Sequence, residues 1–301
     1  MPTFDFDFQR YVERKKGARE AERREGAGYA YAGDLRIRRL LDRARPVTMA
    51  LEATVRLWRG SARAELLGTA LKVTGESQPR VHRAVLRAAE LLHVAVPPVH
   101  LSPHLLLSVH TFGTDDEPQI VLHAGLADSL SDDELLHTLG AELGRIQNNH
   151  VLLATAHYYL LRAGSTFVRW IVKPAVASLD LWSRRALVTV DRAGLLSSRN
   201  LAASSQAIGK LAAASLQPVP SVDHEPIADD EPPLPGMPPH DPDIDPDEVV
   251  ALDVARRAAA LEVFSRSAYY RGVVGETGGL SAEDTDAQTA TALKTTPKRG
   301  G

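Results

Sequence analysis

The segment IVLHAGLADSLSDDELLHTLGAELGRIQNNHV, residues 120–151, contains the strand and the helix that decide the fold. It begins within the apolar run 119–123, which is typical of a strand buried in a sheet. Ser131 is followed three residues later by Glu134, and a hydroxyl at the N-cap with acids in the first turn marks a helix start. We therefore expect a strand over 119–123 and a long helix from Ser131 to about His150.

Helical and extended patterns continue on both sides of this segment. The other predicted elements are helices over 47–73, 81–92 and 152–172 and from about 183 onward, and short strands over 99–101 and 105–109. Asp34 precedes a further helical pattern and is expected to cap it. The predicted fold class is α+β, mostly α, with N-terminal helices and a small three-stranded sheet.

The composition excludes several kinds of site before any motif is considered. The chain has 301 residues, no cysteine and 11 histidines, so disulfides, thiolate nucleophiles and zinc sites built with sulfur are excluded. Any metal would need His, Asp and Glu ligands. The formal net charge of -3 gives no overall attraction to nucleic acid or anionic lipid. Basic residues near the N-terminus alternate with glutamates, so no nucleic-acid partner is expected.

Charge and proline content divide the chain into five parts. Residues 217–248 are rich in proline and acids and contain no Lys or Arg, which indicates an extended acidic linker. An apolar stripe after it predicts a helix, and the Gly- and Thr-rich end predicts disorder. The expected parts are an N-terminal helical region 1–77, a central domain 78–216, the linker 217–248, a C-terminal helix 249–272 and a disordered tail 273–301.

The apolar stretches predict no secretion signal and no membrane span. The start, MPTFDFDFQR, carries acids and aromatics where a signal peptide needs basic residues followed by an apolar run. The uncharged stretch 146–161 is too short and too polar to cross a bilayer, and charged residues interrupt 163–182. We expect a cytoplasmic protein. The aromatic group Tyr158, Tyr159, Phe167 and Trp170 is expected to pack on the N-terminal helices, with contact to a membrane surface or a partner as the alternative.

Three separated stretches resemble one family, the HtpX and CAAX prenyl protease zinc metallopeptidases. Residues 120–151 resemble the strand, the helix and the zinc-binding motif of that family, usually H-E-x-G-H-I-x-x-x-H. The stretch WSRRALVTVDRAGLL, residues 182–196, resembles its second motif, S-R-x-x-E-x-x-A-D-R-x-G, and residues 81–101 extend the match upstream. The resemblance implies a metallopeptidase-like domain over 78–216, with a zincin-like core in which the sheet lies over the long motif helix.

The resemblance implies a zinc site, but its three ligand positions hold other residues. In the family, two histidines of the first motif and a glutamate of the second bind zinc, and the first-motif glutamate activates the bound water. Here Ala141 and Arg145 stand at the histidine positions and Leu187 at the third, while Glu142 keeps the position of the base. A methyl, a guanidinium and an isobutyl group offer zinc no lone pair. We therefore expect no cofactor and a vestigial base at Glu142.

The residues kept around this site are expected to have structural roles. Arg145 follows Glu142 by one helical turn and is expected to fill the vacated metal position and pair with it. Asp191 is expected to make a structural hydrogen bond or ion pair. Arg192 and His150 match the remaining positions of the two motifs and are expected near the site.

Two further predictions concern metal and peptide binding near the sheet. A displaced zinc site at His137 and His123 is an alternative to the loss of metal, with zinc as cofactor only in that case. Relatives bind substrate by adding a strand to the sheet edge, which places His110, Thr111 and Phe112 at a peptide-binding edge.

Three functions remain open at this level. The first is a pseudopeptidase that acts as a binding or regulatory module for a protein or peptide partner, an active relative included. The second is an active zinc metalloendopeptidase with displaced ligands. The third is a structural subunit that uses the acidic linker and the tail as contact points.

Overall fold

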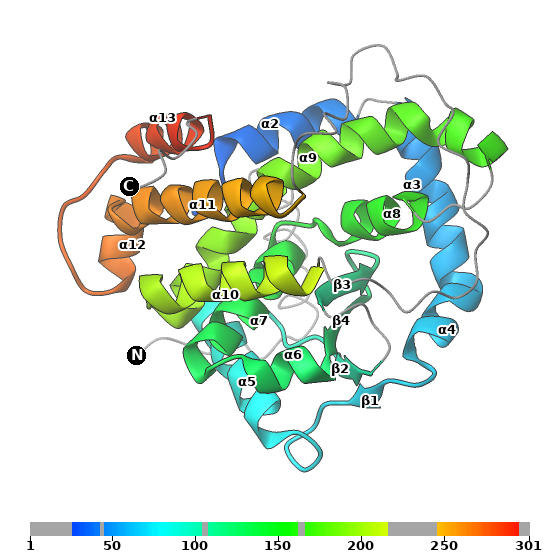
Figure 1. Cartoon of the computed structure of the whole chain (residues 1–301), viewed down its shortest axis with the longest axis horizontal. Helices are drawn as coiled ribbons and strands as arrows, with labels where there is room; N and C mark the ends of the chain where they lie inside the picture. Colours follow the sequence, from blue (N-terminus) through cyan, green and yellow to red (C-terminus); the bar gives the residue numbers. More distant parts are fainter. Residues whose placement is uncertain (1–25, 43–44, 104–107, 162–165, 216–245, 295–301) are drawn as a thin grey trace, which may run out of the picture.

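The computed structural model describes residues 26–42, 45–103, 108–161, 166–215 and 246–294 (Figure 1). These residues are mostly helical with one small sheet, which confirms the predicted fold class. The helical elements are α2 (Ala32–Leu41), α3 (Arg45–Leu57), the wide turn η1 (Trp58–Ala62), α4 (Arg63–Leu67), α5 (Pro79–Leu92), α6 (Ala124–Ser129), α7 (Asp132–Gln147), α8 (Val151–Leu161), α9 (Thr166–Ser198), α10 (Leu201–Ser215), α11 (Pro246–Ser265), α12 (Ala268–Val273) and α13 (Ala282–Ala292). The strands are β1 (Leu71–Lys72), β2 (Val99–Ser102), β3 (Val109–Gly113) and β4 (Pro118–His123).

The sheet has four strands among the described residues, in the order β1-β2-β4-β3, one more than predicted. β2 runs parallel to β4, and β3 pairs antiparallel with the other side of β4. The additional strand is β1, whose Leu71 pairs with Leu101 although the apolar pattern predicted helix as far as residue 73. The helical prediction was wrong there because a two-residue edge strand depends on its neighbouring strand more than on its own periodicity.

Three other local predictions were wrong at element boundaries. α9 continues through Ser183, where a separate helix was expected, and spans 33 residues. β3 begins at Val109, where the predicted strand was to end, and residues 105–107 lie outside the described residues. Asp34 is not the N-cap of α2: Tyr31 holds that position, and Asp34 lies buried in the first turn. Its carboxylate makes tertiary contacts instead, which a local pattern cannot reveal.

The C-terminal part also departs from the prediction. The single helix expected over 249–272 is two helices, α11 and α12, and the tail expected to be disordered contains α13. Ser281 caps α13 by accepting a hydrogen bond from the backbone N–H of Asp284, and α13 packs on α11. Composition misled here because tertiary packing supplies most of the stability of a short helix. Residues 246–248, predicted to belong to the acidic linker, are the first residues of α11. The rest of the linker, 217–245, and residues 295–301 lie outside the described residues.

The motif helix α7 lies at the centre of the fold. Leu135, Leu139 and Leu143 of α7 are fully buried, with α5 and α9 packed against it. In Figure 1, α12 and α13 lie at one end of the molecule and α3 and α4 at the other. Within the described ranges, no helix is both long and apolar enough to cross a membrane.

Candidate functional site

The start of the motif helix is fixed by the capping arrangement that the sequence predicted. The backbone N–H of Glu134 donates to Ser131 Oγ at 3.3 Å, and the Ser131 N–H donates to Glu134 Oε2 at 2.6 Å. Two amides at the helix start are satisfied in this way. The cap sets the rotation of α7 and therefore the direction in which Glu142 points, almost three turns later.

The second motif lies on α9, which crosses α7 at very short distance. A Cβ built on Gly144 would lie 2.3 Å from Cβ of Ala193, and one built on Gly140 would lie 2.2 Å from Ser197 Oγ. A Cβ on Gly194 would likewise lie 2.5 Å from the ring of His137. The two motifs are thus held in contact by glycines at the crossing, where no larger residue fits without movement.

The carboxylate of Glu142 is buried and engaged on both oxygens. The hydroxyl of Thr111, on β3, donates to Oε2 at 2.6 Å. Arg145 donates from Nε to the same oxygen at 3.2 Å and from Nη2 to Oε1 at 3.4 Å. The side chain of Glu142 is 5% exposed and that of Arg145 is 16% exposed. The ion pair expected between these residues is therefore present, and Thr111 is a partner that the sequence did not identify.

The side chains at the ligand positions do not fit a zinc ion. Ala141 is buried, Leu187 is half-buried, and the guanidinium of Arg145 bonds to Glu142. None of the three carries a lone pair that zinc can use. Across the residues that the structure describes, no group of three or more His, Cys, Asp or Glu side chains is arranged to hold a metal ion.

His137 is buried beside the helix crossing. It is completely buried, and neither ring nitrogen has a hydrogen-bond partner among the described residues. Burial lowers its pKa to about 4, against the nearby charge of Asp191, and the charge of Arg257 acts in the same direction as burial. The ring is therefore neutral at physiological pH. The structure does not join His137 and His123 in a metal-binding group.

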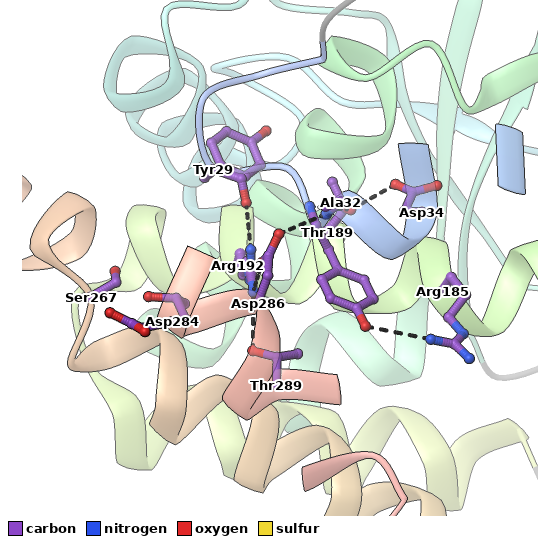
Figure 2. A network of polar contacts seen from close by, with 12 residues as sticks. Tyr29, Ala32, Asp34, Arg185, Thr189, Arg192, Ser267, Asp284, Asp286 and Thr289 are labelled. Atoms are coloured by element: carbon purple, nitrogen blue, oxygen red, sulfur yellow. Dashed lines mark hydrogen bonds and ion pairs between the residues drawn. The ribbon is translucent and has the colours of Figure 1, made fainter. Parts of the chain in front are cut away.

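Asp191 and Arg192 of the second motif bind the C-terminal helices. Asp191 receives two hydrogen bonds from the Arg257 guanidinium on α11, at 2.7 and 2.9 Å. Arg192 donates to the backbone oxygen of Tyr29 at 3.1 Å and to Asp286 on α13 at 2.8 Å (Figure 2). The structural ion pair expected of Asp191 is present, and its partner lies beyond the linker, where sequence reasoning had no signal for it.

His150 lies in a second buried network that sequence reasoning missed. Its Nε2 lies 3.1 Å from Oδ2 of Asp34, and the same carboxylate accepts hydrogen bonds from Thr189 at 2.6 Å and from the Trp182 indole at 3.1 Å. Burial alone would raise the pKa of Asp34, but His150, Thr189 and the charge of Arg38 together hold it below its ordinary value. This network attaches α2 to α9 and to the turn between α7 and α8.

The predicted peptide-binding edge is an edge strand, as required, but much of it is covered. The backbone N–H and C=O groups of successive β3 residues point alternately toward β4 and toward the outer edge of the sheet. Those of Val109, Thr111 and Gly113 face the outer edge. The outward amide of Gly113 already donates to Thr155 Oγ1 of α8 at 3.0 Å. His110 is half-buried, while the other four residues of β3 are buried.

The aromatic group expected on the helical hairpin packs inward where the structure describes it. Tyr158 contacts the rings of His110 and Phe112, with centroids 5.6 and 4.8 Å away. Tyr158 and Tyr159 lie against the cluster of Trp58, Phe112 and Val121. The side chains of Phe167 and Trp170 lie outside the described part.

Comparisons with known proteins support a resemblance to a metallopeptidase family. The model of Peptidase family M48 matches residues 76–218. Plastoglobule-localized metallopeptidase 48, chloroplastic, from Arabidopsis thaliana is 30% identical over 136 residues, which is 44% of this chain and 40% of that protein. The chain therefore spans about two fifths of the length of this relative. No solved structure matches the chain at a significant level.

Proposed function

We propose that the peptidase family M48 domain over residues 76–218 has lost zinc and proteolytic activity, and that it serves this protein as a binding or regulatory module. This proposal rests on the Glu142 carboxylate, whose oxygens accept hydrogen bonds from Thr111 and Arg145. A zinc peptidase needs this carboxylate free to take a proton from a water that the metal has acidified. Both oxygens are instead bonded to protein groups.

The physical case rests on how much chemistry the metal supplies. Bound zinc lowers the pKa of water from about 16 to about 7 and polarises the scissile carbonyl. General-base assistance alone contributes roughly 10²–10⁴-fold, which does not replace the metal. Ala141, Arg145 and Leu187 give zinc no ligand, and Arg145 holds a fixed positive charge 3.2 Å from the Glu142 carboxylate.

The partner that we propose is an extended peptide or a protein segment added to β3. The outward backbone groups of Val109 and Thr111 are those that such a strand would use. Amide hydrogen exchange tests this directly: a peptide selected by display against the folded protein should slow exchange at Val109 and Thr111. Gly113 is the internal control, because its outward amide is already bonded to Thr155. Protection elsewhere, with both amides unchanged, would remove β3 from the proposal.

Metal analysis of the purified protein tests the loss of zinc. We expect less than stoichiometric zinc after equilibration and no cleavage of casein, with Glu142→Gln indistinguishable from wild type. One zinc per chain, with cleavage that Glu142→Gln abolishes, would overturn the proposal in favour of an active metalloendopeptidase with displaced ligands.

A restoration variant tests the alignment of the motifs. Ala141→His, Arg145→His and Leu187→Glu together should create a zinc site that binds at least tenfold more tightly than a two-histidine control. The control is Arg83→His with Arg87→His, an i, i+4 pair on the exposed face of α5. If the folded triple variant binds zinc no better than this surface pair, the assignment of the three ligand positions is wrong.

The proposal includes a cytoplasmic location with, at most, peripheral contact to a membrane. Fractionation of cells that express the full chain tests it. Recovery in the membrane pellet after a high-salt wash would contradict it.

A further inference from the structure

A pocket lies where α3 ends and α4 begins. Its volume is about 510 Å³, and it is lined by Trp58, Arg59, Gly60, Arg63, Ala64, Leu67 and Glu117. The backbone at Gly60 leaves the helical region, with φ −80° and ψ −110°, so the chain is kinked between the two helices. A Cβ on Gly60 would meet nothing within 4 Å, so the kink faces open space.

The charged groups that line this pocket are mainly cationic. Arg59 and Arg63 lie on either side of the kink at Gly60, and both are exposed. Among the side chains that the structure describes here, the one acid in the lining is Glu117, whose Oε2 lies 3.7 Å from Nη1 of Arg63 with both side chains about half exposed. Such an exposed and long ion pair contributes little, so it does not commit Arg63 to Glu117. Arg59 and Arg63 can therefore turn toward an anion.

The surroundings of the pocket are positive as well. His100 on β2 is partly buried, and its pKa is lowered by burial and by the charges of Lys72 and Arg63. Lys72 on β1 and Arg63 on α4 therefore both make the surroundings of His100 more positive. This positive field would favour an anion at the kink.

Trp58 gives the pocket a fixed aromatic wall. The residue is 1% exposed, and its ring packs against Phe112 with centroids 6.3 Å apart, which holds the ring in place. The indole Nε1 is buried beside Gly113, 3.4 Å from where a Cβ on that glycine would lie. A ligand in the pocket would therefore contact the ring and not the N–H.

We propose that this pocket binds a small organic anion, with a carboxylate or phosphate head at Arg59 and Arg63, and an apolar body along Trp58, Ala64 and Leu67. Arginine donates to such heads in pairs, and hydrogen bonds to charged groups are stronger than those between neutral ones. The pocket volume suits a compound of roughly ten to fifteen non-hydrogen atoms. The site does not include Glu142 and does not rest on the function proposed above, although Trp58 packs on Phe112, the neighbour of Thr111 in β3.

Titration of the full chain with small probes tests the proposal. Phenyl phosphate and phenylacetate each carry an oxyanion head and an aromatic body, and benzyl alcohol is the neutral control. Saturable binding of either anion, with a shift of the Trp58 indole N–H signal in ¹H–¹⁵N spectra, is expected, and benzyl alcohol should not saturate. Phosphate-only or carboxylate-only binding also supports the site and narrows the class.

Variants connect the binding to named groups. Arg59→Gln and Arg63→Gln should each weaken the probe about tenfold. Arg87→Gln is the matched control, an exposed arginine on α5 paired with Glu90. The proposal is overturned if neither anion binds, if benzyl alcohol binds as well, or if the pocket variants behave like Arg87→Gln while folded by circular dichroism.

Discussion

Replacing Arg145 with leucine should destabilise the fold by about 2 kcal/mol, because it leaves the Glu142 carboxylate buried with Thr111 as its remaining partner. Breaking a fully buried ion pair costs about 3–5 kcal/mol, and a hydrogen bond to a charged group contributes about 1.5–3 kcal/mol. The expected loss is taken from the lower end of these two ranges, because Arg145 is 16% exposed and its donor–acceptor distances are 3.2 and 3.4 Å.

A double-mutant cycle isolates the pair from packing effects. The variants are Arg145→Leu, Glu142→Gln and both together, unfolded in urea at pH 7 and followed by circular dichroism. The expected coupling energy is about 1–1.5 kcal/mol, because Glu142→Gln removes the charge that Arg145→Leu would leave uncompensated.

The chain contains a matched control pair with the same spacing. Arg87 and Glu90 are also i and i+3 on a helix, 2.7 Å apart, but their side chains are 53% and 70% exposed. A cycle on this pair should give about 0.5 kcal/mol or less. Equal coupling in the two pairs, or no loss of stability in Arg145→Leu, would refute the idea that Arg145 stabilises the buried carboxylate.

Three further predictions concern the core. The pKa of His137 is about 4 in the folded protein and near 6.5 in the unfolded chain, so between these pH values only the unfolded state gains a proton. The free energy of unfolding should therefore fall by about 2 kcal/mol from pH 7 to pH 5. Urea unfolding of His137→Leu should lose this pH dependence. Gly144→Ala should lower stability by about 2 kcal/mol through overpacking at α9, whereas Gly209→Ala, in open space on α10, should raise it by about 1 kcal/mol, as thermal melts will show. Asp191→Asn removes the charge that faces Arg257, and limited proteolysis should then release the C-terminal helices faster.

Local patterns predicted the motif helix well. The Ser131 cap, the apolar positions of α7 and the i, i+3 pair of Glu142 and Arg145 are all encoded within one or two helical turns. Such features depend on groups close together in the sequence, so the sequence is enough to predict them.

Local sequence patterns could not predict contacts between segments that lie far apart in the sequence. Thr111 on Glu142, Asp34 on His150 and Arg257 on Asp191 each join residues of different elements. No spacing rule relates such residues, and a carboxylate such as Asp34 is then assigned the common local role of an N-cap. The helix α13 was missed for a related reason, since its stability comes from its neighbours and not from its composition.

The position of Arg192 has a consequence for how this domain could be inherited. Arg192 lies within the family match, but its partners Tyr29, Asp286 and Thr289, and the rings of Tyr31 and Phe264 beneath its guanidinium, all lie outside residues 76–218. Recombination that moved only the matched segment into another chain would leave behind both the rings that cover this guanidinium and the acid that pairs with it. The segment that evolution can exchange as a whole is therefore larger than the one that family comparison recognises, and it must include both flanks.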